Sequence, residues 1–86
     1  MTYAVEYNPD AIKGLKAASA EDRRRIENKV TVYASDPFSS HAWANPLTGS
    51  PYVRIRQGNW RAILSVDSKT RGVIVLVVEL RGKVYR

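Results

Sequence analysis

The sequence contains no cysteine and only one histidine in 86 residues. The lack of cysteine excludes a disulfide-stapled secreted mini-protein, a cysteine zinc site and a thiol nucleophile. No apolar run approaches the roughly 18 residues of a membrane span, because the longest, Val73–Val78, has only the length of a strand. The first ten residues lack the basic and apolar blocks of a signal peptide, so we expect a cytoplasmic protein.

The length of the chain predicts one domain over residues 1–86, with no room for a second core. Hydrophobic residues make up 44% of the sequence, which argues against disorder despite a net charge of +6. That charge is segregated: residues 1–51 carry six basic and six acidic residues, whereas residues 52–86 carry eight basic and two acidic ones. Solubility alone would not require this separation, so the pattern favours a polyanionic partner such as nucleic acid or an acidic protein segment.

The order of the predicted elements is β-α-α-β-β-β. An alternating strand over Thr2–Tyr7 precedes a helix over Pro9–Ala18 with Asn8 as its N-cap, and Ser19 caps a second helix. Strands follow at Tyr52–Gln57, Trp60–Val66 and Val73–Arg81, the last apolar on both faces at its start and therefore central and covered. The pattern predicts an α+β fold in which a helical hairpin packs on one face of an antiparallel sheet.

Three local features refine this prediction. Gly14 weakens the first helix but allows a close approach to a neighbour. The run Arg23–Arg25 is consistent with a nucleic-acid patch but is more typical of a solvated helix face. We expect Asp36–Pro51 to be an irregular but packed connection, held to the core by Phe38, Trp43 and Leu47.

The register of the strand pair 52–57 and 60–66 follows from its turn. If Gly58-Asn59 is the whole turn, Arg56 faces Arg61, and Ile55 faces Ala62. Alternation then places Arg54, Arg56 and Arg61 on the face away from the helices. In the last strand we expect the core side to hold Ile74, Leu76, Val78 and Leu80, with Glu79 and Arg81 on the arginine side.

Two arginines opposed across a strand pair repel each other, and the arrangement makes sense if an anion lies between them. The planar guanidinium binds phosphate oxygens in pairs and stacks on bases. The alternative is that Glu79 and the C-terminal carboxylate merely neutralise the cluster.

The chain resembles the RelE/ParE superfamily of toxins from toxin–antitoxin operons. Asn45–Gly49 resembles the "kPL-G" segment of that family, Arg54–Arg61 resembles "R-I-R-x-G-D-Y-R", and Leu80–Arg86 resembles the closing "h-R-x-x-V-Y-R". The resemblance implies two helices on a twisted antiparallel sheet, similar to small microbial ribonucleases. It also implies a cognate antitoxin that wraps the toxin, and no cofactor or metal.

Two activities occur in the superfamily: RelE-like members cleave mRNA in the ribosomal A site, and ParE-like members poison DNA gyrase. For the first, the resemblance makes Arg61, Arg81 and Tyr85 catalytic. The two arginines would hold the scissile phosphate, and Tyr85 would transfer a proton or stack on a base. RNA binding would fall to Arg54, Arg56, Lys83 and Arg86.

The sequence departs from the family where a general base is needed. Family members usually have lysines where this chain has Arg54 and Arg56, and an arginine cannot act as a base. Many also have a histidine where Leu80 stands, and we expect the sole histidine, His41, to have a surface role. Tyr85 is then the first candidate base, with Glu79 second or a counter-ion for Arg81.

We therefore expect a metal-free, ribosome-dependent endoribonuclease that halts translation, with the ribosome and mRNA as partners and DNA contacted only through an antitoxin complex. One alternative is a ParE-like gyrase inhibitor. The other is an inactive relative that serves antitoxin binding and operon regulation.

Overall fold

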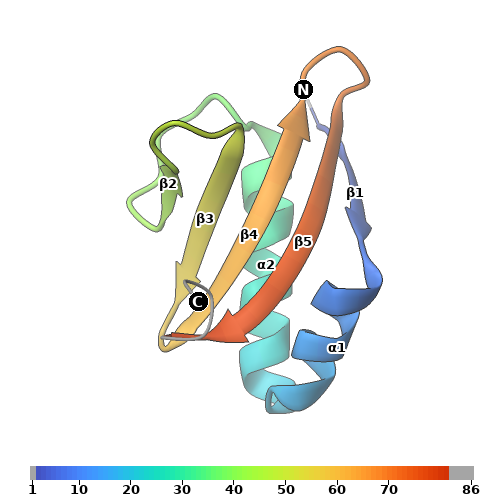
Figure 1. Ribbon diagram of the computed structural model, residues 1–86, viewed down its shortest axis with the longest axis vertical. Helices are drawn as coiled ribbons and strands as arrows, with labels where there is room; N and C mark the ends of the chain where they lie inside the picture. The colour runs from blue at the N-terminus through green and yellow to red at the C-terminus, as the bar shows by residue number, and fades with distance from the viewer. Residues whose placement is uncertain (1, 82–86) are drawn as a thin grey trace.

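The computed structural model describes residues 2–81, which form two helices and a five-stranded sheet (Figure 1). The elements are β1 (Ala4–Tyr7), α1 (Pro9–Ala17), α2 (Ala20–Ser35), β2 (Ala44–Pro46), β3 (Tyr52–Gln57), β4 (Trp60–Asp67) and β5 (Gly72–Leu80). The strand order is β1-β5-β4-β3-β2, and both helices cover the same face of the sheet (Figure 1). In residues 2–81, no helix is long and apolar enough to cross a membrane.

The helices begin where the sequence predicts. The Asn8 side chain accepts a hydrogen bond from the Ala11 amide, and the Ser19 hydroxyl accepts one from the Asp22 amide. Arg23 does not belong to a solvated face as expected: its guanidinium donates to the carbonyl oxygens of Leu15 and Ala18. These carbonyls lie at the end of α1, where the Leu15 oxygen also accepts a bond from the Ala18 amide at 3.2 Å. Arg23 therefore ties the end of one helix to the start of the next.

The sheet is mixed, whereas the sequence analysis predicted an antiparallel one. β1 pairs in parallel with β5, and the other three strand pairs are antiparallel. The parallel pairing is possible because the chain crosses over through both helices before it returns to the sheet. The short strand β2, which was not predicted, extends the sheet at the edge of β3.

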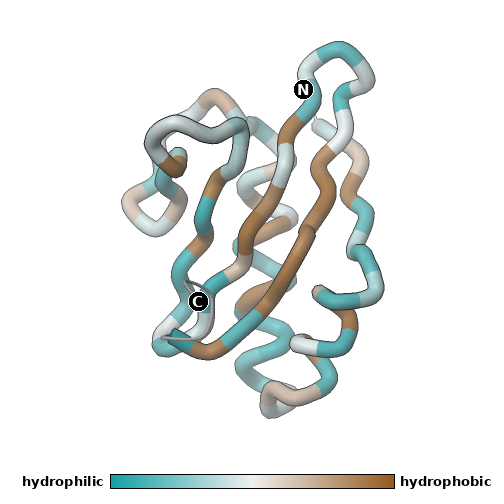
Figure 2. The backbone as a smooth tube through the Cα atoms, viewed as in Figure 1, coloured by the Kyte–Doolittle hydropathy of each residue, from teal (hydrophilic) through white to brown (hydrophobic). Residues whose placement is uncertain are grey.

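The core lies between the helices and the sheet. Hydrophobic residues concentrate along β4 and β5 (Figure 2), and Leu64, Val75 and Val78 are fully buried against residues such as Ile26 and Val30 of α2. Gly14 brings α1 close to β5, as predicted: a Cβ atom there would lie 1.8 Å from the Val78 carbonyl oxygen.

The predicted core face of β5 is wrong except at Val78. The buried residues are Val73, Val75 and Val78, while Ile74 and Leu80 are 39% and 41% exposed. The cause is a β-bulge: Leu64 pairs with Val75 but Ile63 pairs with Val77, so one extra residue shifts the alternation. β5 is central in the sheet as predicted, but at Ile74 it is not covered on both faces.

The connection between α2 and β3 is packed less tightly than expected. Trp43 is half-buried against the core and Leu47 is partly buried, but Phe38 is 75% exposed and does not hold the segment to the core. The Phe38 ring lies in a T-shaped arrangement with the buried Tyr3, at 6.1 Å between ring centroids.

Candidate functional site

The β3–β4 hairpin places its arginines on the sheet face opposite the helices. Arg56 pairs directly with Arg61, and Ile55 pairs with Ala62, which confirms the register predicted from the two-residue turn. Ile55 and Ala62 are buried on the helix side, so alternation directs the neighbouring Arg56 and Arg61 to the other face. Gly58 has a φ of +57°, a conformation that glycine adopts readily and that the predicted turn requires.

Main-chain carbonyls hold the two opposed arginines. The Nη1 atom of Arg61 donates to the carbonyl oxygens of Gly58 and Trp60, both at 2.9 Å. The Nη2 atom of Arg56 donates to the Ala42 carbonyl at 3.3 Å. A guanidinium carries five N–H groups and a permanent positive charge, which suits both side chains to an anionic ligand.

The end of β5 meets this hairpin. Glu79 pairs with Arg61 across β4 and β5, which puts the carboxylate on the arginine face as predicted. The Arg81 amide donates to the Asn59 carbonyl at 2.6 Å, so the main chain of residue 81 lies against the turn that precedes Arg61. Arg81 follows the last strand residue and is exposed, and its side chain is not directed by strand alternation.

Of the remaining predicted site residues, Arg54 lies on β3 opposite Ile63 and is half-buried. Lys83, Tyr85 and Arg86 lie outside the described residues. Within residues 2–81, no group of three His, Cys, Asp or Glu side chains is arranged to hold a metal ion.

A cavity of about 320 Å³ lies at the arginine pair and is lined by Ala42, Trp43, Arg56, Gly58 and Arg61. We call it the Trp43 notch. Among residues 2–81, its lining contains two cations and no carboxylate, which suits an anionic ligand.

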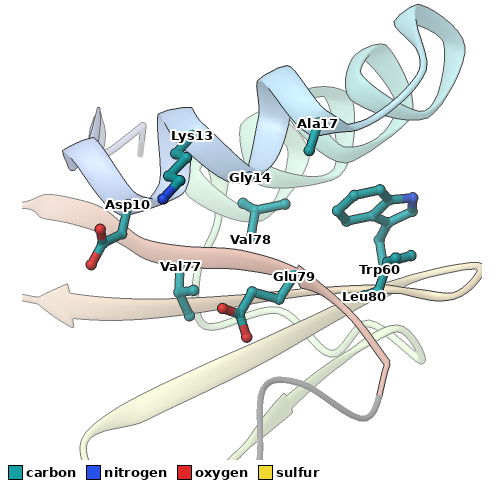
Figure 3. Close-up of a pocket in the computed structure, with 9 residues that line it drawn as sticks. All are labelled: Asp10, Lys13, Gly14, Ala17, Trp60, Val77, Val78, Glu79 and Leu80. Carbon is teal, nitrogen blue, oxygen red and sulfur yellow. The ribbon is translucent and has the colours of Figure 1, made fainter.

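A larger cavity, of about 390 Å³, lies between α1 and the end of β5 (Figure 3). Figure 3 shows Val78 directed towards Gly14, with Val77 and Glu79 on the other side of the strand. The charged residues that line this larger cavity are of both signs, namely Asp10, Lys13 and Glu79. The cavity is therefore a poorer match to a phosphate chain than the Trp43 notch.

The sequence did not identify Lys29 and Trp43 as neighbours of the arginines, and it predicted the wrong environment for His41. Lys29 of α2 donates from Nζ to the Arg56 carbonyl at 2.8 Å, and the same atom lies 5.4 Å from the centre of the Trp43 ring. Burial, and then the charge of Arg56, lower the pKa of the Lys29 ammonium. His41 is half-buried and stacks on Trp43 at 4.6 Å with 24° between the rings, so the expected surface role is wrong.

One sequence signal could have drawn attention to Lys29. It lies three residues after Ile26 and four before Tyr33, both buried, so helical spacing places it at the border of the buried face of α2. Its contact with Arg56 spans 27 residues of sequence and could not be read from local patterns.

No protein-family model and no curated protein matches the chain, but solved structures do. A chain of the archaeal RelE–RelB complex from Pyrococcus horikoshii OT3 is 25% identical, with a TM-score of 0.81 over 96% of this chain and 99% of that one. The isolated E. coli RelE toxin is 21% identical, with a TM-score of 0.80 over 98% and 92% of the two chains. A chain of the E. coli DinJ–YafQ toxin–antitoxin complex is 16% identical, with a TM-score of 0.78 over the whole of both. The protein thus has the RelE-like fold, as the sequence resemblance implied.

Proposed function

We propose that this protein, whose fold is that of RelE-type toxins, is the toxin of a toxin–antitoxin pair and a metal-free endoribonuclease that cleaves mRNA on the ribosome. The observation that carries the proposal is the Arg56–Arg61 pair, with Glu79 beside Arg61 on the next strand. Two arginines opposed across a strand pair repel each other, and an RNA phosphate bound between them would offset that repulsion. A cytoplasmic location and a halt in translation follow from this proposal.

In the proposed reaction the 2′-hydroxyl of the RNA attacks the adjacent phosphorus atom. A base takes the hydroxyl proton, the P–O5′ bond breaks, and an acid protonates the leaving 5′ oxygen, so the products carry a 2′,3′-cyclic phosphate and a 5′-hydroxyl. No metal or cofactor takes part in this scheme. Arg61 and Arg81 stabilise the extra negative charge of the transition state. Electrostatic stabilisation of this kind is usually the largest single contribution to the rate enhancement of an enzyme.

The other residues have supporting roles in this scheme. Arg54, Arg56, Lys83 and Arg86 bind the RNA backbone. Tyr85 transfers a proton or stacks on a base, and Glu79 acts as a base or as the counter-ion of the arginines. The pairing of Glu79 with Arg61 supports the second of these roles for Glu79 at least as well as the first.

An antitoxin is the proposed protein partner. The structures of RelE–RelB and DinJ–YafQ are toxin–antitoxin complexes, and their chains share the fold of this protein. The sheet face that carries the arginines is not covered by either helix (Figure 1), so a partner segment has direct access to it.

The test is to induce the protein in cells, map new 5′ ends on translated mRNAs and measure DNA supercoiling in the same culture. We expect cuts within reading frames and unchanged supercoiling, and none of these cuts with Arg61→Ala. Lys69→Ala is the matched control, because Lys69 is an exposed cation between β4 and β5. The loop that joins these two strands lies at the end of the pair opposite the β3–β4 turn (Figure 1). Intact mRNA together with gyrase-linked double-strand breaks would support a ParE-like inhibitor, and no effect on either would support an inactive relative.

A further inference from the structure

The Trp43 notch has an aromatic wall beside two cations. Trp43 lies just before β2, and its carbonyl oxygen accepts a hydrogen bond from the Arg56 amide at 2.8 Å. This bond fixes the main chain of residue 43 next to the strand residue that pairs with Arg61. An indole and a guanidinium therefore line the same cavity at a fixed separation along the sheet edge.

Two further contacts fix the Trp43 ring itself. His41 stacks on it at 4.6 Å, and the Lys29 ammonium lies 5.4 Å from its centre. The Nε2 atom of His41 is buried and has no hydrogen-bond partner among the described residues, so packing on the aromatic ring holds the imidazole. A ring that is already immobilised loses little conformational freedom when a ligand packs against it.

The charged side chains that the described part of the chain places at the notch are positive. Arg56 and Arg61 line the notch, and Lys29 adds a third cation at its rim through its bond to the Arg56 carbonyl. An aromatic surface among cations is the combination by which proteins bind single-stranded nucleic acid, since the base packs on the ring while the backbone phosphate meets the cations. A cavity of about 320 Å³ is also within the size range of small-molecule binding sites.

We propose that the Trp43 notch is a nucleotide subsite for single-stranded RNA. One base packs against Trp43, and its phosphate lies at Arg56 and Arg61. The inference rests on the proposed ribonuclease function, which it deepens: the notch fixes which nucleotide lies next to the scissile phosphate. Lys29 contributes to affinity through charge, and His41 is a positioning residue for the ring.

The first experiment locates the base without changing the protein. A short single-stranded RNA with 2′-O-methyl groups, which cannot be cleaved by the proposed chemistry, carries one 5-iodouridine and is irradiated with the purified protein at low salt. We expect the cross-linked peptide to contain Trp43. The 5-iodouridine is placed at each position of the RNA in turn. Cross-linking only to residues other than Trp43, or no cross-linking at any position, overturns the proposal.

The second experiment measures affinity for the same RNA by fluorescence anisotropy. Trp43→Leu should weaken binding about 5- to 150-fold, the loss typical of one base–aromatic contact, whereas Trp43→Phe should retain most of the affinity. Phe38→Leu is the matched control, since Phe38 is an aromatic residue of the same connection that lies outside the notch. Equal affinity of the wild type and a correctly folded Trp43→Leu variant overturns the proposal.

An RNA with one abasic position separates this subsite from general charge attraction. With the wild type, removal of one base should cost about as much as Trp43→Leu, and Trp43→Leu should bind the intact and abasic RNAs equally. These binding measurements do not depend on cleavage. Binding through Trp43 without any mRNA cleavage would refute the proposed ribonuclease activity and support the nucleotide subsite. Cleavage of mRNA with no role for Trp43 in binding would refute the subsite and support the ribonuclease activity.

Discussion

Arg56 and Arg61 lie directly opposite each other across the β3–β4 hairpin, and their side chains donate to different main-chain carbonyls. Arg56 is held to the segment before β2, and Arg61 is held to its own turn. These bonds offset part of the repulsion between the two charges. In the proposed function, a bound RNA phosphate offsets the repulsion between the two arginines.

Removal of Arg61 should affect activity far more than stability. We expect Arg61→Ala to change the free energy of unfolding by less than about 1 kcal/mol, because lost hydrogen bonds and relieved repulsion nearly cancel. Activity should fall about 10²- to 10³-fold, as is typical when one donor to a transition-state anion is removed. Arg56→Ala should have a similar effect on stability with a smaller loss of activity.

Denaturant unfolding at two salt concentrations, together with mRNA cleavage rates, measures both effects. Added salt should stabilise the wild type relative to Arg61→Ala, since it screens the repulsion that only the wild type retains. An Arg61→Ala protein that is several kcal/mol less stable yet still cleaves mRNA at the wild-type rate would make Arg61 a structural residue.

Gly14→Ala should destabilise the protein although alanine is the better helix former. The new methyl group would lie 1.8 Å from the Val78 carbonyl oxygen, so α1 must move away from β5. We expect a loss of about 1–3 kcal/mol from this overpacking, larger than the gain of about 1 kcal/mol in helix propensity. Lys16→Ala, at an exposed position of the same helix, should change stability by less than about 0.5 kcal/mol. Equal stability of Gly14→Ala and Lys16→Ala would show that the contact is not tight.

Stability should fall steeply in strong alkali because of Tyr7. Burial, and then the charge of Glu27, raise the pKa of Tyr7 to about 12. The unfolded chain releases this proton near pH 10, so the contribution of Tyr7 to stability is complete below about pH 10 and is lost as the pH rises towards 12. Tyr7→Phe should make the fall in unfolding free energy over this range shallower. Glu27→Gln should do so to a smaller degree, because burial is the larger cause.

Urea unfolding between pH 9 and pH 12 provides the comparison, with tyrosinate absorbance of the folded protein as an independent titration. The same alkaline slope in the wild type and in Tyr7→Phe would show that Tyr7 ionises equally in both states.

The antitoxin should carry a net negative charge in the segment that binds this protein. The arginine face offers Arg54, Arg56 and Arg61, and the exposed apolar side chain of Ile74 lies farther along the same sheet, opposite Ser65. An acidic amphipathic segment complements both features. A structure of the complex in which these arginines all remain exposed, with no other obstruction of the site, would contradict this.

The sequence was sufficient to predict the hairpin register and not the face of β5. A two-residue turn admits one pairing, so the positions of Arg56 and Arg61 followed from local geometry. Every residue from Val73 to Val78 is apolar, so no alternation of polar and apolar residues indicates which side chains face the core. For the same reason the sequence does not reveal the bulge opposite Ile63 and Leu64.

The Trp43 notch could not be predicted from the sequence, because the contacts that form it join distant parts of the chain. Arg56 meets the Ala42 carbonyl 14 residues away and Lys29 27 residues away, and no periodicity encodes such contacts. Phe38 and Trp43 look alike as aromatic residues of one irregular segment, yet only Trp43 turns towards the core. Tertiary packing, and not local pattern, decides which of the two aromatics joins the site.

The central claim is that the 2′-hydroxyl of the RNA is the nucleophile, and a single substitution in the message tests it. A synthetic mRNA with one 2′-deoxynucleotide at a mapped cleavage position is translated in vitro with the purified protein, beside the all-ribose message. We expect cleavage at that position to stop, while other sites are cut to leave a 2′,3′-cyclic phosphate and a 5′-hydroxyl. Efficient cleavage immediately after the deoxynucleotide would contradict the account.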